Sequence, residues 1–183
     1  MGDDLRYWVG FNLARGIGPV RLRALIGAFG SVEAAWTASE AALRAAKLND
    51  RAIESVLQIR HRQDLDVAMA QIERLDVRVL TWESPDYPVL LAQVDDAPPV
   101  LYVRGAMTAA DEWAVAMVGT RKATVYGREV ARRLAVELGR SGVTIVSGLA
   151  RGIDGIAHRA AIEAGGRSIA VLGSGVDQVY PPE

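Results

Sequence analysis

The chain has 183 residues, of which half are hydrophobic and 23% are charged, with a net charge of −1; this is the composition of a soluble globular protein rather than of a disordered chain. It contains no cysteine, which excludes disulfides, thiol chemistry and cysteine-based metal sites and fits a protein of the cytoplasm. No apolar run reaches the length of about 18 residues that a membrane-spanning helix needs, and the polar start of the chain does not resemble a signal peptide. We therefore expect a cytoplasmic protein without a membrane partner.

The first 76 residues are expected to form a helical domain, because apolar side chains recur at helical spacing over residues 7–75 without strand-like alternation. Within it, residues 13–26 resemble a helix-hairpin-helix, in which a Gly16-Ile17-Gly18 hairpin joins two short helices and Pro19 begins the second. The backbone N–H groups of such a hairpin can bind a DNA phosphate without reading its sequence. A tight turn inside a packing domain accounts for the same residues equally well.

Residues 77–183 are expected to form a second domain of α/β class. It begins with two strand-like segments, residues 77–82 and 98–105, near which Tyr87 and Tyr102 lie. The two tyrosine rings could stack on nucleic-acid bases. Aromatic side chains at strand edges, however, more often pack in a core or at its rim, and we prefer that interpretation.

Strand, glycine turn and helix then alternate along the chain. Apolar runs at residues 114–118, 143–146 and 168–172 each end in a glycine turn, and amphipathic helices are expected between them. We expect Thr124 to cap the first helix and Gly142 to end it. This alternation predicts a Rossmann-like parallel sheet with flanking helices. Ligands of such sheets bind at the carboxyl ends of the strands, which is where the glycine turns fall.

The two glycine turns that precede the helices are the predicted phosphate-binding loops. The residues expected to contact phosphate are Gly119, Thr120, Arg121, Lys122, Gly148, Arg151 and Gly152. Arginine can hold a phosphate through two hydrogen bonds, lysine adds a mobile charge, and the N-terminus of the following helix adds its dipole. Residues 119–167 carry a net charge of +5, whereas residues 1–118 carry −4. The local excess of positive charge suits a phosphate-bearing ligand.

The sequence contains no pattern that marks a catalytic centre, a metal site or a cofactor site. The first loop is neither a dinucleotide-binding G-x-G-x-x-G nor a Walker A motif, and a G-x-S-x-G elbow is absent. Asp154 and His158 share a helix face, where a metal site or an acid/base pair is conceivable, but two residues make an incomplete site. We prefer a structural contact between the two side chains that fixes the start of the helix. The prediction is a binding protein without catalysis.

Three blocks of the sequence resemble the DNA-processing protein A (DprA/Smf) family in their order and spacing. They are residues 118–127, residues 146–158, and residues 170–177 followed by Tyr180-Pro181. The upstream strands and the glycine hairpin follow the layout of the family as well, so the resemblance covers essentially the whole chain. It implies a SAM-like or helix-hairpin-helix-like N-terminal domain followed by an extended Rossmann-like domain.

The resemblance also implies a function. Members of this family bind single-stranded DNA that is taken up during natural transformation in competent cells, protect it, load the RecA recombinase onto it for recombination, and usually dimerise. By similarity, Gly119, Thr120, Arg121 and Lys122 would contact DNA phosphates, as would the glycines and the arginine of the second loop. The implied partners are single-stranded DNA, RecA and a second copy of the chain.

The family's Rossmann-like domain normally continues with further strands and an Arg-Asn-Arg block after the point that corresponds to residue 183. We therefore expect this domain to be truncated at its C-terminal side, with an open sheet edge that is available for pairing. By resemblance, the RecA contacts, the dimer contacts and part of the DNA groove belong to that further half.

Two other functions remain open. One is a nucleotide-binding or nucleotide-hydrolysing Rossmann-like enzyme related to the lysine-decarboxylase-like phosphoribohydrolases, although those enzymes carry a Pro-Gly-Gly-x-Gly-Thr block that this chain lacks. The other is a non-catalytic interaction module, in which the glycine turns serve only the tight packing of strands and helices. Mononucleotide binding that survives high salt would favour the enzyme, and the absence of any ligand would favour the module.

Overall fold

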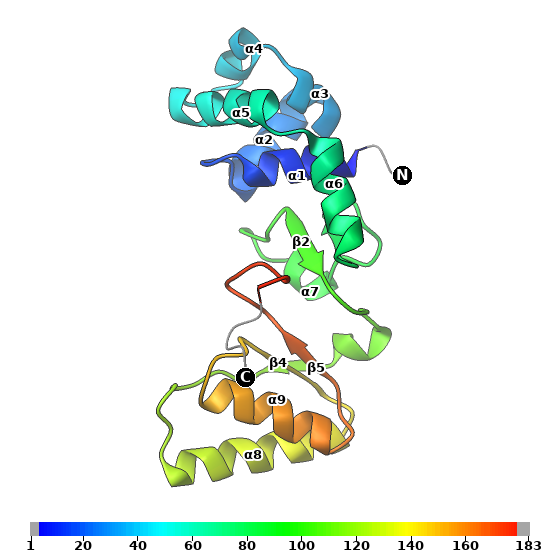
Figure 1. Ribbon diagram of the computed structural model, residues 1–183, viewed down its shortest axis with the longest axis vertical. Coiled ribbons are helices and arrows are strands. Elements are labelled where there is room, and N and C mark those ends of the chain that lie inside the picture. Colours follow the sequence, from blue (N-terminus) through cyan, green and yellow to red (C-terminus); the bar gives the residue numbers. More distant parts are fainter. Residues whose placement is uncertain (1–3, 179–183) are drawn as a thin grey trace. The chain divides into compact units, whose positions relative to one another are not determined.

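The structure, a computed structural model, describes residues 4–178 and divides into two compact units (Figure 1). The first unit ends at Gly105 and the second begins at Ala106. Each unit contains a hydrophobic core of its own. The Tyr180-Pro181 pair of the third sequence block lies outside the described residues.

Helices make up most of the first unit. In chain order they are α1 (Leu5–Leu13), α2 (Pro19–Phe29), α3 (Val32–Thr37), α4 (Glu40–Ala45), α5 (Asp50–Arg62) and α6 (Leu65–Arg74). Side-chain caps explain where the last four begin, because each N-cap oxygen accepts a backbone N–H of the first turn; these caps are Ser31, Ser39, Asn49 and Asp64. Pro19 opens α2, as predicted, and Gly30 ends it in the left-handed conformation, at φ 87°. The glycine hairpin at residues 16–18 therefore joins two helices.

A two-stranded antiparallel ribbon completes the first unit. β1 (Arg78–Thr81) pairs with β2 (Val100–Val103), with Val79 opposite Tyr102, and the short helix α7 (Val89–Ala92) lies in the connection between them. The predicted domain boundary near residue 76 falls between α6 and β1. Val79 and Val100 belong to the same core cluster as the helices, so the ribbon packs on the helical part of the chain.

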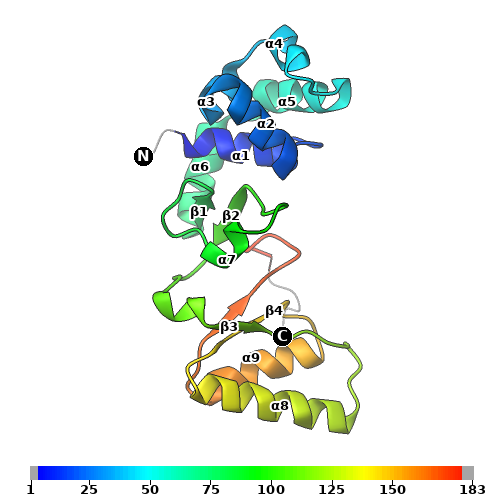
Figure 2. The same ribbon diagram turned by 180° about the vertical axis from the view of Figure 1, so that it is seen from behind.

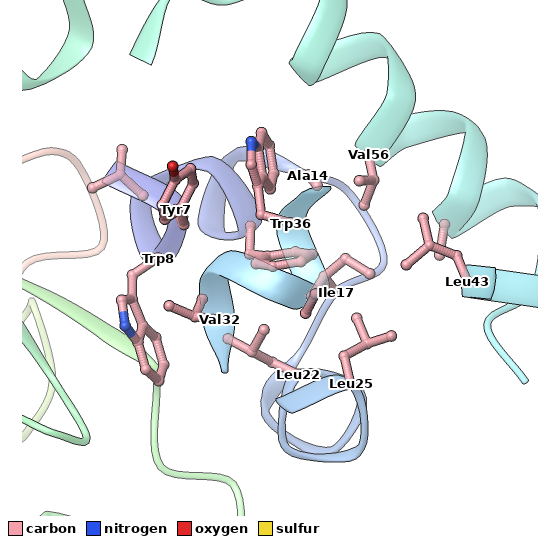
Figure 3. Packing of buried hydrophobic residues seen from close by; sticks show 14 of the residues in the cluster. Tyr7, Trp8, Ala14, Ile17, Leu22, Leu25, Val32, Trp36, Leu43 and Val56 are labelled. Atoms are coloured by element: carbon pink, nitrogen blue, oxygen red, sulfur yellow. The ribbon is translucent and has the colours of Figure 1, made fainter. Parts of the chain in front are cut away.

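Aromatic side chains dominate the core of the first unit (Figure 3). Trp8 and Phe11 of α1 are almost completely buried, and the Phe11 ring meets Trp36 of α3 edge to face, with the ring centroids 5.0 Å apart. Gly10 lies beneath the same indole, because a Cβ atom at that position would come within 2.7 Å of Trp36. Aliphatic side chains from the hairpin, α2 and α5 fill the remaining space (Figure 3). Each such buried side chain contributes about 1.5–3 kcal/mol of hydrophobic stabilisation.

The second unit is a parallel sheet of three strands with two helices on one side (Figures 1 and 2). Its elements are the 3₁₀-helix Ala109–Glu112, β3 (Ala114–Ala116), α8 (Val125–Arg140), β4 (Thr144–Ser147), α9 (Ile153–Glu163) and β5 (Ser168–Ala170). The strand order is β3-β4-β5, and the register places Ile145 opposite Val115 on one side and Ser168 on the other. The predicted α/β fold, a helical N-terminal part followed by a Rossmann-like parallel sheet with flanking helices, is confirmed.

The first α-helix of the second unit, α8, begins and ends at the predicted residues, and it packs closely on α9. Thr124 caps α8 by accepting the Gly127 N–H at 3.1 Å, and Gly142 follows the end of the helix with φ 78°. Gly139 lets α8 approach α9, because a Cβ atom there would lie 3.3 Å from the Ala161 carbonyl oxygen. The buried core between the helices and the sheet consists of small side chains around one isoleucine: Ala135, Ile145, Ala157, Ala160 and Ala161.

Candidate nucleic-acid interface

The two predicted phosphate-binding loops lie side by side at the carboxyl ends of β3 and β4. The Met117 N–H donates to the Val146 carbonyl at 2.9 Å and so continues the strand pairing past the end of β3. The Ser147 hydroxyl donates back to the Met117 carbonyl at 2.5 Å. Because both loops leave from these paired residues, the sheet itself holds their starting points together.

The N-terminus of α9 joins the second loop to the first. The Ile153 N–H donates to the Thr120 carbonyl at 3.2 Å, and the Gly119 N–H donates to Asp154 Oδ1, also at 3.2 Å. Asp154 is only 6% exposed, and its place in the first helical turn suits a carboxylate, because the helix dipole favours negative charge there. Residues that are 35 positions apart in the chain thus form one local structure.

The glycines of the two loops are required by close packing. A Cβ atom on Gly119 would lie 2.7 Å from the Ile153 side chain, and one on Gly148 would lie 2.9 Å from Asp154 Oδ2. Gly152 has φ 91°, which side chains rarely allow, and its Cβ atom would overlap the backbone of Thr120 and Arg121. Tight loop packing therefore explains all three glycines without a ligand.

The first loop is a closed turn that displays two cations. The Lys122 N–H donates to Thr120 Oγ1 at 3.1 Å, which leaves the Thr120 hydroxyl proton able to donate to a ligand. The Gly119 N–H is already taken by Asp154, so it is not available to a phosphate. Arg121 and Lys122 are both exposed, and within the described residues neither forms an ion pair. Arg151 of the second loop is exposed as well.

Asp154 and His158 act as structural residues, but their hydrogen bonds go to other partners than each other. His158 Nδ1 lies 2.6 Å from Ser168 Oγ, and that hydroxyl donates to the Ile145 carbonyl at 3.1 Å, so Nδ1 must carry the proton that Ser168 accepts. The other ring nitrogen, Nε2, is buried without a hydrogen-bond partner in the described part of the chain. Burial lowers the pKa of His158, although the Ser147 backbone and the Asp154 charge oppose the shift. Both side chains are thus internal supports of the loops.

Tyr87 and Tyr102, the two possible base-stacking residues, pack into the protein instead of being exposed as that role requires. Tyr87 is 6% exposed, its hydroxyl donates to the Pro98 carbonyl at 2.7 Å, and burial raises its pKa. Tyr102 is half-buried, and burial raises its pKa too. The preferred interpretation as packing residues is confirmed for both. The exposed aromatic side chain near the loops is Tyr126, in the first turn of α8, which the sequence analysis did not single out.

One arginine of the basic region has a structural partner at the other end of the sheet. Arg167, just before β5, holds Asp111 through two hydrogen bonds, from Nε at 2.8 Å and from Nη2 at 2.9 Å. Burial by itself raises the pKa of Asp111, but the hydrogen bonds from Arg167, Thr108 and Thr144 outweigh it and lower the pKa below its usual value. This pair ties the segment before β3 to the start of β5, so Arg167 is not a candidate ligand for DNA.

Other kinds of site find no support in the residues that the structure describes. Residues 4–178 contain no group of three or more His, Cys, Asp or Glu side chains placed to hold a metal ion. Within the same range, no helix is both long enough and apolar enough to cross a bilayer.

Comparisons with known proteins agree with one another. A family model described as DNA recombination-mediator protein A matches residues 78–183. Protein Smf of a Synechocystis species is 37% identical over 99% of this chain and 47% of its own length, and the DNA processing protein DprA of Bacillus subtilis is 40% identical over 63% of this chain and 39% of its own. The X-ray structure of DNA processing protein A from Streptococcus pneumoniae superimposes with a TM-score of 0.76 at 25% identity, covering 97% of this chain and 60% of that one. The chain thus spans about half, or less, of the length of these curated relatives.

Proposed function

Because the chain belongs to the family of DNA recombination-mediator protein A, we propose that it binds single-stranded DNA without sequence preference and without catalysis. Its relatives carry the names Smf and DNA processing protein DprA, which supports a role in DNA processing. The DNA would be held through its phosphates by the two loops at the carboxyl ends of β3 and β4. Thr120, Arg121, Lys122 and Arg151 would contact the phosphates, and Gly119, Gly148 and Gly152 would let the loops pack closely enough to present them.

The observation that carries this proposal is the locking together of the two loops by α9. Ile153 and Asp154 each bind the backbone of the first loop, so Arg121 and Lys122 project from a backbone whose shape is set by the fold. A rigid display of cations suits phosphates, because binding then requires little ordering of the protein. The N-terminus of α8, which follows the first loop directly, adds a favourable dipole for negative charge.

The energetics would be those of counterion release. Each phosphate neutralised by lysine or arginine frees condensed cations, so the affinity falls steeply as salt rises. The glycines would contribute indirectly, by allowing the close packing that brings the cations together, rather than by offering amides to phosphate.

The family resemblance extends the proposal to the cell. The bound strand would be DNA taken up during natural transformation, which the protein would protect and present to the RecA recombinase in the cytoplasm, acting as a homodimer. The helical part of the first unit, up to about residue 76, would be a SAM-like domain, and residues 77–183 would belong to a Rossmann-like DNA-binding domain.

Two features weigh against the alternative functions. For an enzyme, Asp154 and His158 are the only acid/base pair that the sequence suggests, and both are more than nine-tenths buried and engaged with the loops and with β5. For an interaction module, close packing explains the glycines well but gives no reason for exposed cations on the same loop.

Fluorescence anisotropy of a labelled oligo-dT with the wild-type chain and its Arg121→Ala variant, at several salt concentrations, tests the proposal. We expect the variant to bind all single strands more weakly by a similar factor and to lower the salt slope by about 0.7–1, the value for one lost phosphate contact. Arg140→Ala is the matched control, because Arg140 is the last residue of α8, the helix that follows the first loop. At 1.5 Å per residue, it lies roughly 20 Å from that loop.

Three outcomes would contradict the assignment. A loss of binding that depends on the DNA sequence would mean that Arg121 reads bases, and an equal loss in both variants would mean that only overall charge matters. If the wild-type chain binds no oligonucleotide at any salt concentration, the proposed function of this chain is wrong.

A further inference from the structure

Three large apolar side chains stand exposed beside the first loop. Val118, Val125 and Tyr126 are 75%, 84% and 79% exposed, although burying each of them would be favourable by about 1.5–3 kcal/mol. Single exposed apolar residues are ordinary, whereas a cluster of them beside charged residues marks a binding surface. These three flank Arg121 and Lys122 on both sides in the sequence.

The cluster continues into a groove between the end of β3 and one side of α8. The groove has a volume of about 430 Å³ and a mainly apolar lining of Ala116, Met117, Val118, Tyr126, Gly127, Val130, Ala131, Leu134 and Ile153. Tyr126, Val130 and Leu134 follow one another at intervals of four residues, so they form a stripe along one face of α8.

The groove and the cationic loop share a wall. Val118 immediately precedes Gly119, and Ile153 packs against Gly119 so closely that a Cβ atom there would lie 2.7 Å away. A ligand that reaches along the groove to Ile153 therefore arrives beside the loop that carries Arg121 and Lys122. The surface accordingly requires a ligand that is anionic on one side and flat and apolar on the other.

Tyr126 is placed to contact such a ligand. It lies in the first turn of α8, which Thr124 fixes through its cap, and within residues 4–178 its hydroxyl makes no hydrogen bond. Among the described residues, this side chain is therefore not held by a polar contact. Nucleic-acid bases are flat and apolar, and stacking on an aromatic ring is how proteins bind them without reading sequence.

We propose that the groove binds bases of the strand whose phosphates lie on Arg121 and Lys122, and that Tyr126 stacks on one of them. The inference rests on the proposed function and adds the reason why the strand must be single. In a duplex the base faces are stacked on each other and cannot reach Tyr126, whereas the phosphates are equally accessible. The groove thus supplies the preference for single strands that cations alone cannot supply.

The experiment separates bases from phosphates. Anisotropy titrations of the wild-type chain use an oligo-dT, an abasic oligonucleotide of the same length, which keeps the phosphates but has no bases, and a duplex. We expect the wild-type chain to prefer oligo-dT over both. Tyr126→Ala should weaken oligo-dT binding by about 5- to 100-fold, the range that corresponds to one lost stacking contact, and leave the affinity for the abasic strand unchanged.

Two further variants serve as controls. Tyr126→Phe keeps the ring and should retain the affinity for oligo-dT, which separates stacking from any role of the hydroxyl. Ile162→Ala removes an apolar side chain of α9 that is 62% exposed and lies outside the groove, and it should change neither affinity.

The failures of the two proposals are distinguishable. If the wild-type chain binds neither strand, the proposed function fails and this inference fails with it. If Tyr126→Ala weakens both strands equally, or leaves oligo-dT binding intact, the groove does not hold bases, while phosphate binding by the loops stands. The latter result is expected if the groove instead docks a protein segment.

Discussion

The two units of this chain achieve their structure in different ways. The helical unit buries eighteen residues of its described part in one cluster, among them Trp8, Phe11 and Trp36. In the described part of the sheet unit, the core cluster contains five buried hydrophobic residues, and four of these are alanines. Large side chains interlock in the first unit, whereas backbones approach each other directly in the second.

This difference separates stability from function. Where the core is made of large side chains, the interior supplies the stabilisation. Both units expose large apolar side chains, among them Val20 and Leu90 in the helical unit and Tyr126 and Leu134 in the sheet unit. In the sheet unit, glycines and hydrogen bonds hold the loops, and the exposed Tyr126 lies in the helical turn that follows the exposed cations of the first loop. That combination, rather than apolar exposure alone, makes the sheet unit the one suited to bind a ligand. Three substitutions test the comparison.

Phe11→Ala should have the largest effect. The side chain is fully buried and packs against Trp36, so its removal leaves a cavity and should lower the free energy of unfolding by about 3–5 kcal/mol. Urea denaturation followed by tryptophan fluorescence measures this loss, because three of the four tryptophans, Trp8, Trp36 and Trp82, lie in the first unit, and the fourth, Trp113, is already 76% exposed in the folded chain. Val20→Ala, at a position 72% exposed, should change it by less than about 0.5 kcal/mol. Similar losses in the two variants would mean that the cluster does not stabilise the unit.

Gly152→Ala should have the next largest effect, in the sheet unit. The new Cβ atom meets both an unfavourable φ and the backbone of the first loop, for an expected loss of about 2–4 kcal/mol. Gly165→Ala is the matched control: its φ is 81°, but a Cβ atom there meets nothing within 4 Å, so only the conformational cost of about 1–2 kcal/mol remains.

Native-state hydrogen exchange measures both glycine variants within the sheet unit. The Ile145 N–H, which donates to the Arg167 carbonyl at 3.0 Å, reports the stability of the sheet. Equal exchange rates in Gly152→Ala and Gly165→Ala would show that the close approach of the two loops contributes nothing. The close packing of backbones would then not account for the stability of the sheet unit, and the contrast with the helical unit would fail.

The smallest expected effect is a dependence on pH. Burial lowers the pKa of His158 from the ordinary value of 6.5. Between the lowered pKa and pH 6.5, His158 is therefore mostly protonated in the unfolded chain and mostly neutral in the folded chain. The free energy of unfolding should therefore rise with pH between the lowered pKa and 6.5, by up to about 1.4 kcal/mol per pH unit.

Urea denaturation at pH values from about 5.5 to 7, where carboxylates hardly titrate, isolates this term. His158→Asn keeps an N–H donor for Ser168 but does not titrate, so it should abolish the slope. His61→Asn changes an exposed histidine of α5 and should preserve it. A slope that persists in His158→Asn would assign the pH dependence to another group.

Local signals predict much of this structure. The Thr124 cap and the stop at Gly142 depend on residues within one helical turn, where sequence and backbone conformation are directly coupled. The glycine turns and the parallel order of the strands follow from the alternation of elements. Two of the strands are shorter than their apolar runs: the runs span residues 114–118 and 168–172, whereas β3 ends at Ala116 and β5 at Ala170.

Contacts between distant residues are what the sequence does not reveal. The spacing of Asp154 and His158 indicates a shared helix face, but their true partners, Gly119 and Ser168, are brought in by the sheet. Tyr87 and Tyr126 both lie close to a turn, and only the packing of their surroundings buries the first and exposes the second. The spacing of residues along the sequence identifies which side chains share a face of a helix. It does not identify the residues that pack against that face.

The hydrogen bond from Gly119 to Asp154 bears on how quickly a ligand could be captured. Since hydrogen bonds within the fold already hold the loop, a strand of the kind proposed would not have to wait for the loop to rearrange. The association rate would then be set by diffusion and by the attraction of the exposed cations. Added salt would mainly lower the association rate constant of a strand. Substitutions within the apolar groove would mainly raise its dissociation rate constant.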